Sequence, residues 1–240
     1  MNFDFSEDQK FLANEARKFL ESQCSMAEVR AILDDESKPF SEGVWKKVVE
    51  MGWLGTSIPE EHGGLGLGML EMCVLAEEMG RVLAPVPFTS TAYFFTEALK
   101  LAGSEAQQAD LFPKIVSGEV VGCFAASEGP GNPDAGSLKT VFDGKTLSGL
   151  KVPVTDGDIA THAVVLAKDG KGASLVLVDL SAKGVTKKVL STLDPTRSHA
   201  ELAFDKVPAT LLGKSGDGAR LNDALLDRVA VLIAFEQLGG

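Results

Sequence analysis

Apolar residues recur every three or four positions through most of residues 1–113, which is the period of a helix with one buried face. Two of these segments follow Ser6 and Ser104, and each serine has a glutamine three positions later, the pattern of a capping box at a helix N-terminus. The remaining helices are expected from Ser41 to Gly52, over 69–83 and over 89–102. We therefore predict a helical N-terminal domain over residues 1–113.

The period changes in residues 114–216, where apolar and polar positions alternate or apolar runs are short. A hairpin is expected over 139–147, because Asp143 and Gly144 form a two-residue turn signal between alternating segments. Further strands are expected over 120–126, 163–167, 174–180 and 200–204. Glycine and aspartate turns between these strands predict an antiparallel β-barrel or sandwich as the middle domain.

Residues 217–240 predict one last helix, and its segment 229–235 is apolar on every side. Such a helix belongs inside a larger bundle. We therefore expect either that the protein continues beyond residue 240 or that another chain covers this helix. The predicted fold class is α+β: a helical N-terminal domain, a β middle domain, and the first helix of a largely missing helical-bundle domain. Exposed apolar faces on that helix predict an oligomer.

Composition excludes some classes of partner. The formal net charge of −11 argues against nucleic acid, because binding to a phosphate backbone needs clustered lysines and arginines. Cys24, Cys73 and Cys123 lie far apart, which indicates buried free thiols in a reducing compartment, with no disulfide and no metal site. An acidic start and a terminal apolar run much shorter than a membrane span favour a cytoplasmic protein that does not contact a membrane.

A glycine-rich string, I-P-E-E-H-G-G-L-G-L-G, occupies positions 58–68. Such a loop in front of a helix can hold a phosphate on its backbone amides. Here, however, no strand clearly precedes the loop and no Lys-Ser/Thr pair follows it, so its spacing fits neither common phosphate-binding motif. A structural turn is the favoured interpretation, with His62 and its neighbouring glutamates in solvent.

The same string resembles the I-P-E-x-x-G-G-x-G loop of acyl-CoA dehydrogenases. Three further strings support the resemblance in chain order. A-S-E-G at 126–129 is similar to the family's T-E-P segment, and 148–157 is similar to G-x-K-x-W-I-T-N-G. F-D-K-V-P at 204–208, with L-L-G at 211–213, is similar to F-D-x-V-x-V-P and its following L-L-G. The resemblance covers essentially the whole chain.

The resemblance implies an enzyme of fatty acid metabolism in which a carboxylate removes the α-proton of an acyl-CoA thioester and FAD accepts the β-hydride. By the resemblance, Phe124, Ala126 and Ser127 line the flavin, with Ser127 in place of the usual threonine. Thr155 is expected to approach the reactive nitrogen of the flavin. Pro153 stands where the family has an aromatic residue beside the flavin, so ring stacking is lost at that position.

Other positions also depart from the family's pattern. The family's G-S-D segment aligns with residues 132–134, Asn-Pro-Asp, and a proline there can offer neither an amide hydrogen nor a hydroxyl. In the last helix, Asp227 and Arg228 stand for the family's D-x-x-R, whose arginine lies beside CoA, but the spacing is altered. The catalytic base is expected beyond residue 240, so no catalytic residue is assigned within this chain.

Three functions remain open. The leading prediction is an acyl-CoA dehydrogenase-like oxidoreductase with FAD as cofactor and an acyl-CoA as substrate. The alternatives are a non-catalytic or partner-dependent subunit of a heteromeric acyl-CoA dehydrogenase, and a flavin-dependent monooxygenase of the same fold. The expected partners are like or unlike subunits of the same type, with an electron-transferring flavoprotein as the acceptor of electrons.

Overall fold

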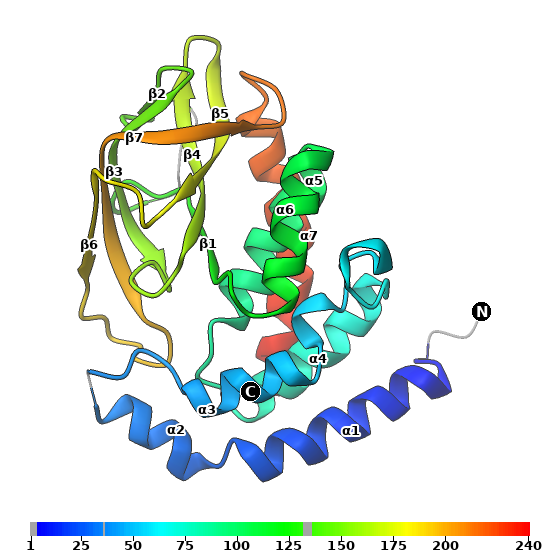
Figure 1. Ribbon diagram of the computed structural model, residues 1–240. Helices are drawn as coiled ribbons and strands as arrows, with labels where there is room; N and C mark the ends of the chain where they lie inside the picture. The colour runs from blue at the N-terminus through cyan, green and yellow to red at the C-terminus, as the bar shows by residue number, and fades with distance from the viewer. Residues whose placement is uncertain (1–3, 36, 132–135) are drawn as a thin grey trace.

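The computed structural model describes residues 4–35, 37–131 and 136–240, in which a helical part packs beside a curled β-sheet (Figure 1). The helices are α1 (Glu7–Gln23), α2 (Met26–Leu33), α3 (Glu42–Glu50), η1 (Trp53–Gly55), η2 (Glu60–His62), α4 (Met69–Arg81), η3 (Thr89–Phe95), α5 (Thr96–Ala102), α6 (Glu105–Val116) and α7 (Gly218–Gly239). The strands are β1 (Gly122–Ala125), β2 (Val141–Phe142), β3 (Thr146–Thr155), β4 (His162–Asp169), β5 (Gly172–Asp179), β6 (Val185–Val189) and β7 (His199–Leu212). The predicted α+β class, with a helical part followed by a β-rich part, is confirmed.

The sheet closes on itself as a barrel. Strand β4 pairs with β5, β5 with β7, β7 with β3, β3 with β2, and β2 again with β4. The prediction of an antiparallel barrel needs one correction, because β1 and β2 both lie parallel to β4. Parallel neighbours need a crossover connection rather than a tight turn. Alternation of apolar and polar residues marks a strand but carries no information about the direction of its neighbour.

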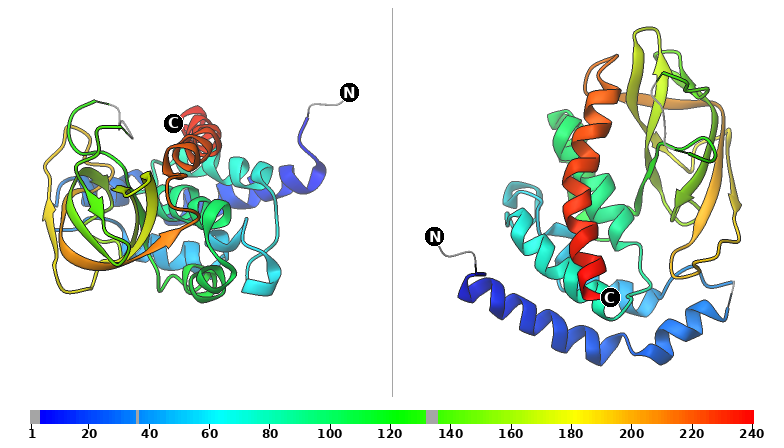
Figure 2. Two further views of the ribbon diagram at one scale, coloured as in Figure 1. Left: turned by 90° about the horizontal axis from the view of Figure 1, so that it is seen from above. Right: turned by 180° about the vertical axis from the view of Figure 1, so that it is seen from behind.

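Strands β4 and β5 are buried on both faces. Ala163 and Val165 point into the core inside the barrel, whereas Val164 and Leu166 belong to the core shared with the helices. This double burial explains why the sequence runs apolar without alternation at 163–167. The helical part therefore packs directly on the outer face of the barrel (Figure 2).

Helix caps formed largely as predicted. Ser6 accepts a hydrogen bond from the Gln9 amide at 3.2 Å and its own amide donates to the Gln9 side chain, and Ser104 with Gln107 repeats the arrangement. The helix expected over 89–102 instead begins as the π-helix η3 and becomes α-helical only at Thr96. In η3, Thr91 exchanges hydrogen bonds with the backbone of Gly122 on β1. The contact with the barrel thus coincides with a wider, π-helical turn. The spacing of apolar residues in the sequence does not predict this turn.

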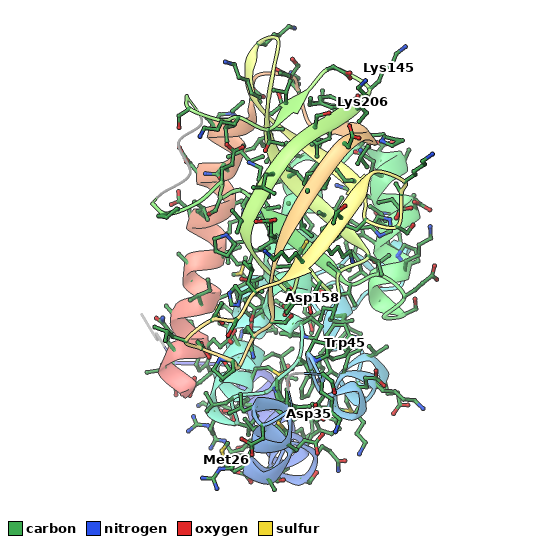
Figure 3. All side chains as sticks on the ribbon, turned by 90° about the vertical axis from the view of Figure 1, so that its left-hand side faces the viewer. Met26, Asp35, Trp45, Lys145, Asp158 and Lys206 are labelled. Carbon is green, nitrogen blue, oxygen red and sulfur yellow. The ribbon has the colours of Figure 1, made fainter. Side chains whose placement is uncertain are left out.

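Helix α2, strand β6 and the short helices η1 and η2 were not predicted. Helix α2 is eight residues long and begins after the capping residue Ser25, so its periodic signal is short. Strand β6 is mostly exposed and pairs with β7. Figure 3 places Met26 of α2 at one end of the molecule and Lys206 of β7 at the other, with Asp158 between them.

The glycine-rich string is a structural turn. Its amides donate to carbonyl oxygens of the same region: Gly64 to Pro59, Leu65 to Gly55, and Leu67 to Thr56. A side chain at Gly64 would bring its Cβ within 2.1 Å of the Ile58 carbonyl oxygen. Because these backbone donors are already satisfied, none of the three is left to hold a phosphate.

Helix α7 is partly covered by this chain itself, whereas the sequence analysis expected its cover to come from beyond residue 240 or from another chain. It runs along the junction between the barrel and the helices, in contact with α4, α5, η3 and β5 (Figure 2). One stripe, formed by Leu221, Leu225, Val229 and Leu232, is buried. On the remaining surface of α7, the apolar side chains of Val231 and Leu238 are 46% and 69% exposed. The chain therefore covers one face of this helix and leaves the other open.

Close contact between α4 and α7 depends on Gly80. A Cβ at this position would lie 1.8 Å from the Glu236 carbonyl oxygen of α7. We predict that Gly80→Ala separates the two helices and lowers the free energy of unfolding by about 3 kcal/mol, measured by urea denaturation.

Gly43→Ala is the matched control, since Gly43 is also helical but has no neighbouring atom within 4 Å of the place that a Cβ would occupy. This control should raise stability by about 0.5–1 kcal/mol through helix propensity alone. Equal urea midpoints for Gly80→Ala and the wild type would contradict the close contact.

Candidate functional site

The residues predicted to line a flavin come together around one cavity of about 390 Å³. The cavity lies at the junction of β1, β3 and β7 with η3 and α7. Its lining residues are Ser90, Phe94, Phe124, Ala126, Ser127, Pro153, Thr155, His199, Asn222 and Leu226. We call this cavity the slot.

Two parallel aromatic rings form part of the slot. The rings of Phe94 and Phe124 have centroids 5.8 Å apart and planes inclined by only 8°. Phe94 comes from η3 and Phe124 from β1, so the helical part and the barrel each contribute one ring. Pro153 and Leu226 add further apolar surface. A slot of this kind suits a flat, largely apolar group.

The loop that carries Ala126 and Ser127 is held by an ion pair between the buried Lys151 and the partly buried Glu128. Lys151 is fully buried, and its Nζ donates to the Ala126 carbonyl oxygen at 2.9 Å and to the Glu128 carboxylate at 2.8 Å. The Val152 amide also donates to the Ser127 carbonyl oxygen. Burial alone raises the pKa of Glu128, but the hydrogen bonds from Lys151 and from two backbone amides outweigh it and lower the pKa to about 2.

A buried carboxylate, Asp156, connects three segments beside the slot. It accepts from the Ser90 hydroxyl of η3 at 2.6 Å, and its own amide donates to the Ser198 carbonyl oxygen ahead of β7. The residue is 2% exposed and has a left-handed backbone with φ of 56°. Burial raises the pKa of Asp156 against the opposing effect of the Ser90 hydrogen bond.

One buried polar atom beside the slot lacks a hydrogen-bond partner in the described part of the chain. The Oδ1 atom of Asn222 on α7 is buried and accepts no hydrogen bond within the described ranges 4–35, 37–131 and 136–240. A buried acceptor without a donor is costly, so this oxygen, on a residue that lines the slot, calls for a donor from a ligand or a water molecule.

An adjoining cavity of about 350 Å³ shares Thr155 with the slot. Its polar end contains an ion pair between Arg197 and Glu236 at 2.8 Å, and the Thr89 hydroxyl donates to the same carboxylate. Arg197 also donates to the Ala84 carbonyl oxygen. This network links the loop before β7 to α7 and to the segment before η3.

Other predicted positions lie apart from the slot. Asp227 is exposed on α7, and Arg228 forms an ion pair with the buried Glu97 of α5 at 3.0 Å. Neither residue lines the slot, although Leu226 immediately before them does. The segment Asn-Pro-Asp at 132–134 lies outside the described residues.

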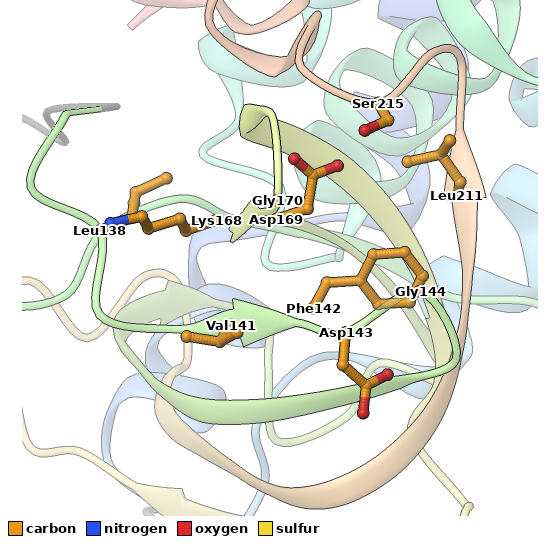
Figure 4. A pocket seen from close by; sticks show the side chains of 10 residues that line it. All are labelled: Leu138, Val141, Phe142, Asp143, Gly144, Lys168, Asp169, Gly170, Leu211 and Ser215. Atoms are coloured by element: carbon orange, nitrogen blue, oxygen red, sulfur yellow. The ribbon is translucent and has the colours of Figure 1, made fainter.

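A larger cavity of about 690 Å³ opens between the β2–β3 and β4–β5 turns (Figure 4). Its two carboxylates already serve local turns: Asp143 accepts from the Thr146 amide, and Asp169 accepts from the Ser174 hydroxyl. None of the residues predicted to line a flavin lies in this cavity. The slot, with its unpaired acceptor, is therefore the stronger candidate.

The sequence alone did not predict the side of the slot that η3 and α7 form. Ser90, Phe94, Asn222 and Leu226 come from η3 and α7, and His199 comes from the start of β7. A histidine or a serine in these segments carries no local motif. A polar Asn222 within the apolar stripe of α7 was the one available signal, because a buried polar residue on a core-facing position calls for a partner.

Residues 6–119 match the family described as "Acyl-CoA dehydrogenase, N-terminal domain". The chain is 31% identical to acryloyl-CoA reductase (NADH) of Anaerotignum propionicum, over 100% of this chain and 64% of the relative. It is also 31% identical to mitochondrial isovaleryl-CoA dehydrogenase of Pongo abelii, over 98% of this chain and 59% of the relative. The chain thus spans about 60% of the length of these curated relatives.

Similarity extends to solved structures. The structure of the "Tcur3481-Tcur3483 steroid ACAD G363A variant" superposes with a TM-score of 0.85 and 32% sequence identity. The match covers 97% of this chain and 63% of that chain. It therefore includes both the helical part and the barrel.

The ion pair between Lys151 and Glu128 should stabilise the folded chain. Glu128→Gln should lower the free energy of unfolding by about 3 kcal/mol at pH 7, because it leaves the buried Lys151 ammonium without a carboxylate. A carboxyl whose pKa is lower in the folded state stabilises the fold above its unfolded pKa. That stabilisation is lost as the pH falls from about 4.5 towards about 2.

Urea denaturation at pH 7, 4.5 and 3.5 measures this effect, and the difference between the two proteins should narrow over that range. The exposed Glu61 provides the control, since Glu61→Gln should change stability by less than about 0.5 kcal/mol. A difference that stays constant down to pH 3.5 would contradict the role given to Glu128.

Proposed function

This chain belongs to the acyl-CoA dehydrogenase family, and we propose that its slot forms part of the flavin site of an acyl-CoA dehydrogenase-like oxidoreductase. The proposed reaction is the α,β-dehydrogenation of an acyl-CoA thioester. The observation that carries the proposal is the meeting of Phe124, Ala126, Ser127, Pro153 and Thr155 around one cavity.

The residues of the slot fit an isoalloxazine ring. The parallel rings of Phe94 and Phe124 offer flat apolar surface, and the cavity volume lies in the range of small-molecule sites. The unpaired Asn222 Oδ1 and the hydroxyls of Ser127 and Thr155 supply the polar contacts that such a ring needs at its edge. These features support FAD as the cofactor.

FAD, when bound, accepts the hydride that leaves the β-carbon of the substrate. The chain's own residues bind and orient: Phe124, Pro153 and Leu226 exclude water from the slot, and the Ser127 hydroxyl takes the place of the family's threonine. The ion pair of Lys151 and Glu128 keeps the Ser127 loop in position. Rigid support of this kind preserves the geometry that hydride transfer requires.

The base that removes the α-proton is proposed to come from outside these 240 residues. No carboxylate lines the slot among the residues that the structure describes. Asp156 lies beside it but accepts from Ser90 and does not line the slot. Proton abstraction needs a carboxylate within hydrogen-bonding reach of the substrate, so this part of the chemistry depends on another segment or subunit.

For the substrate, we propose that Asp227 and Arg228 contribute to binding the CoA portion. The Arg228 side chain is 44% exposed even though it pairs with Glu97, so its guanidinium can still meet an anionic group. Leu226, one position away from Asp227, lines the slot, which brings this part of α7 near the proposed reaction centre.

Assembly with further subunits is part of the proposal. The open face of α7, with Val231 and Leu238 exposed, favours coverage by other helices. The similar steroid ACAD is named for two components, Tcur3481 and Tcur3483, which supports a heteromeric assembly for this chain as well. We propose an electron-transferring flavoprotein as the acceptor that reoxidises the flavin.

A titration of the purified chain with FAD, followed by visible absorption, tests the site. Phe124→Ala should weaken FAD binding about ten-fold, because it removes one of the two parallel rings. Phe11→Ala, at a position 67% exposed on α1, should bind FAD like the wild type. Equal affinity of the wild type and Phe124→Ala would refute the slot as the flavin site.

Anaerobic addition of butyryl-CoA to the FAD-loaded chain tests the origin of the base. We expect the flavin absorption to persist with the chain alone and to bleach once a segment or partner subunit that carries the base is supplied. Bleaching by the 240 residues unaided would show that the base lies within them.

A further inference from the structure

The hydroxyl hydrogen of Thr155 is directed to a protein acceptor rather than into the slot. His199 Nδ1 lies 3.1 Å from the Arg197 carbonyl oxygen, and a carbonyl oxygen can only accept. In a neutral imidazole, Nδ1 therefore carries the hydrogen and Nε2 accepts. Thr155 Oγ1, which lies 3.3 Å from Nε2, must then donate to it. Only the lone pairs of Thr155 remain for a ligand.

Ser90 has its single hydrogen committed in the same way. Its Oγ lies 2.6 Å from the Asp156 carboxylate and 3.2 Å from the Pro87 carbonyl oxygen. Both neighbours accept, so whichever takes the hydrogen leaves Ser90 with lone pairs alone towards the slot. Burial of Asp156 behind this hydroxyl keeps water from competing for it.

Asn222 contributes a third acceptor. Its Nδ2 lies 3.3 Å from the Asp223 carboxylate, which orients the amide with the nitrogen towards that acceptor. The opposite atom, Oδ1, is the buried oxygen without a donor among the described residues. The three polar side chains from η3, β3 and α7 thus share one property: each can accept from a ligand.

We propose that Ser90, Thr155 and Asn222 form an acceptor surface in the slot, set by the positioning residues His199 and Asp156, that selects a ligand edge carrying hydrogen-bond donors. The identity of the ligand rests on the proposed function. Two-electron reduction of an isoalloxazine ring, with uptake of a proton, converts N5 from an acceptor into an N–H donor. An acceptor surface therefore binds reduced flavin more tightly than oxidised flavin and raises the reduction potential.

The tautomer of His199 is measurable without any flavin. The sequence has three histidines, so two-dimensional ¹H–¹⁵N correlation spectra of the imidazole rings at pH 8 can be assigned with His62→Gln and His162→Gln. We expect His199 to carry its hydrogen on Nδ1. A hydrogen on Nε2 would overturn the proposal, because Thr155 would then accept from His199 and be free to donate to the ligand.

The consequence for flavin is measured by comparing dissociation constants for oxidised FAD and for FAD reduced with dithionite. His199→Leu removes the acceptor for Thr155 and should shift the ratio of the two constants about five-fold against the reduced form. This shift corresponds to a reduction potential lower by about 20 mV. His199→Gln, whose side-chain oxygen can accept from Thr155, should keep the wild-type ratio, which a purely structural role of His199 would not explain.

The outcomes separate the two proposals. Failure of the chain to bind FAD in either redox state would refute the proposed function, while the tautomer measurement would still decide the role of His199. An unchanged ratio in a folded His199→Leu protein that binds FAD would overturn the acceptor surface and leave the flavin site intact.

Discussion

The burial of strands β4 and β5 on both faces is the constraint on which the rest of the structure depends. Their inner face closes the barrel core, and their outer face completes the core of the helical part. Neither core can form fully without the other, because burial of apolar surface is the main favourable term in folding. The helices are therefore held at a defined position against the barrel, and the slot is the space that remains where the two surfaces diverge.

Buried polar groups then determine the shape of that space. Lys151 and Glu128 hold the loop after β1, and Asp156 connects η3 to the turn after β3 and to the segment before β7. Charges placed at such depth cost desolvation free energy and persist only with good hydrogen-bond geometry. Their concentration around one cavity, next to the unpaired Asn222 oxygen, supports the proposal that this junction binds a ligand.

Gly80 allows α7 to pack closely against α4. In this position one face of α7 is buried in the core of this chain, and Asn222 and Leu226 line the slot. The other face keeps its exposed apolar residues. The proposed ligand site and the exposed apolar face thus lie on the same helix, α7.

Features that depend on residues close together in the chain could be predicted from the sequence alone. Capping serines marked helix ends, Asp143 and Gly144 marked a hairpin, and ordered motifs identified the family and five residues that meet in the slot. Only the folded chain shows the parallel placement of β1, the π-helical turn of η3, the burial of α7 and the contribution of Ser90, His199 and Asn222. These features arise from contacts between segments distant in the chain, and such contacts leave no periodic or spacing signal in either segment.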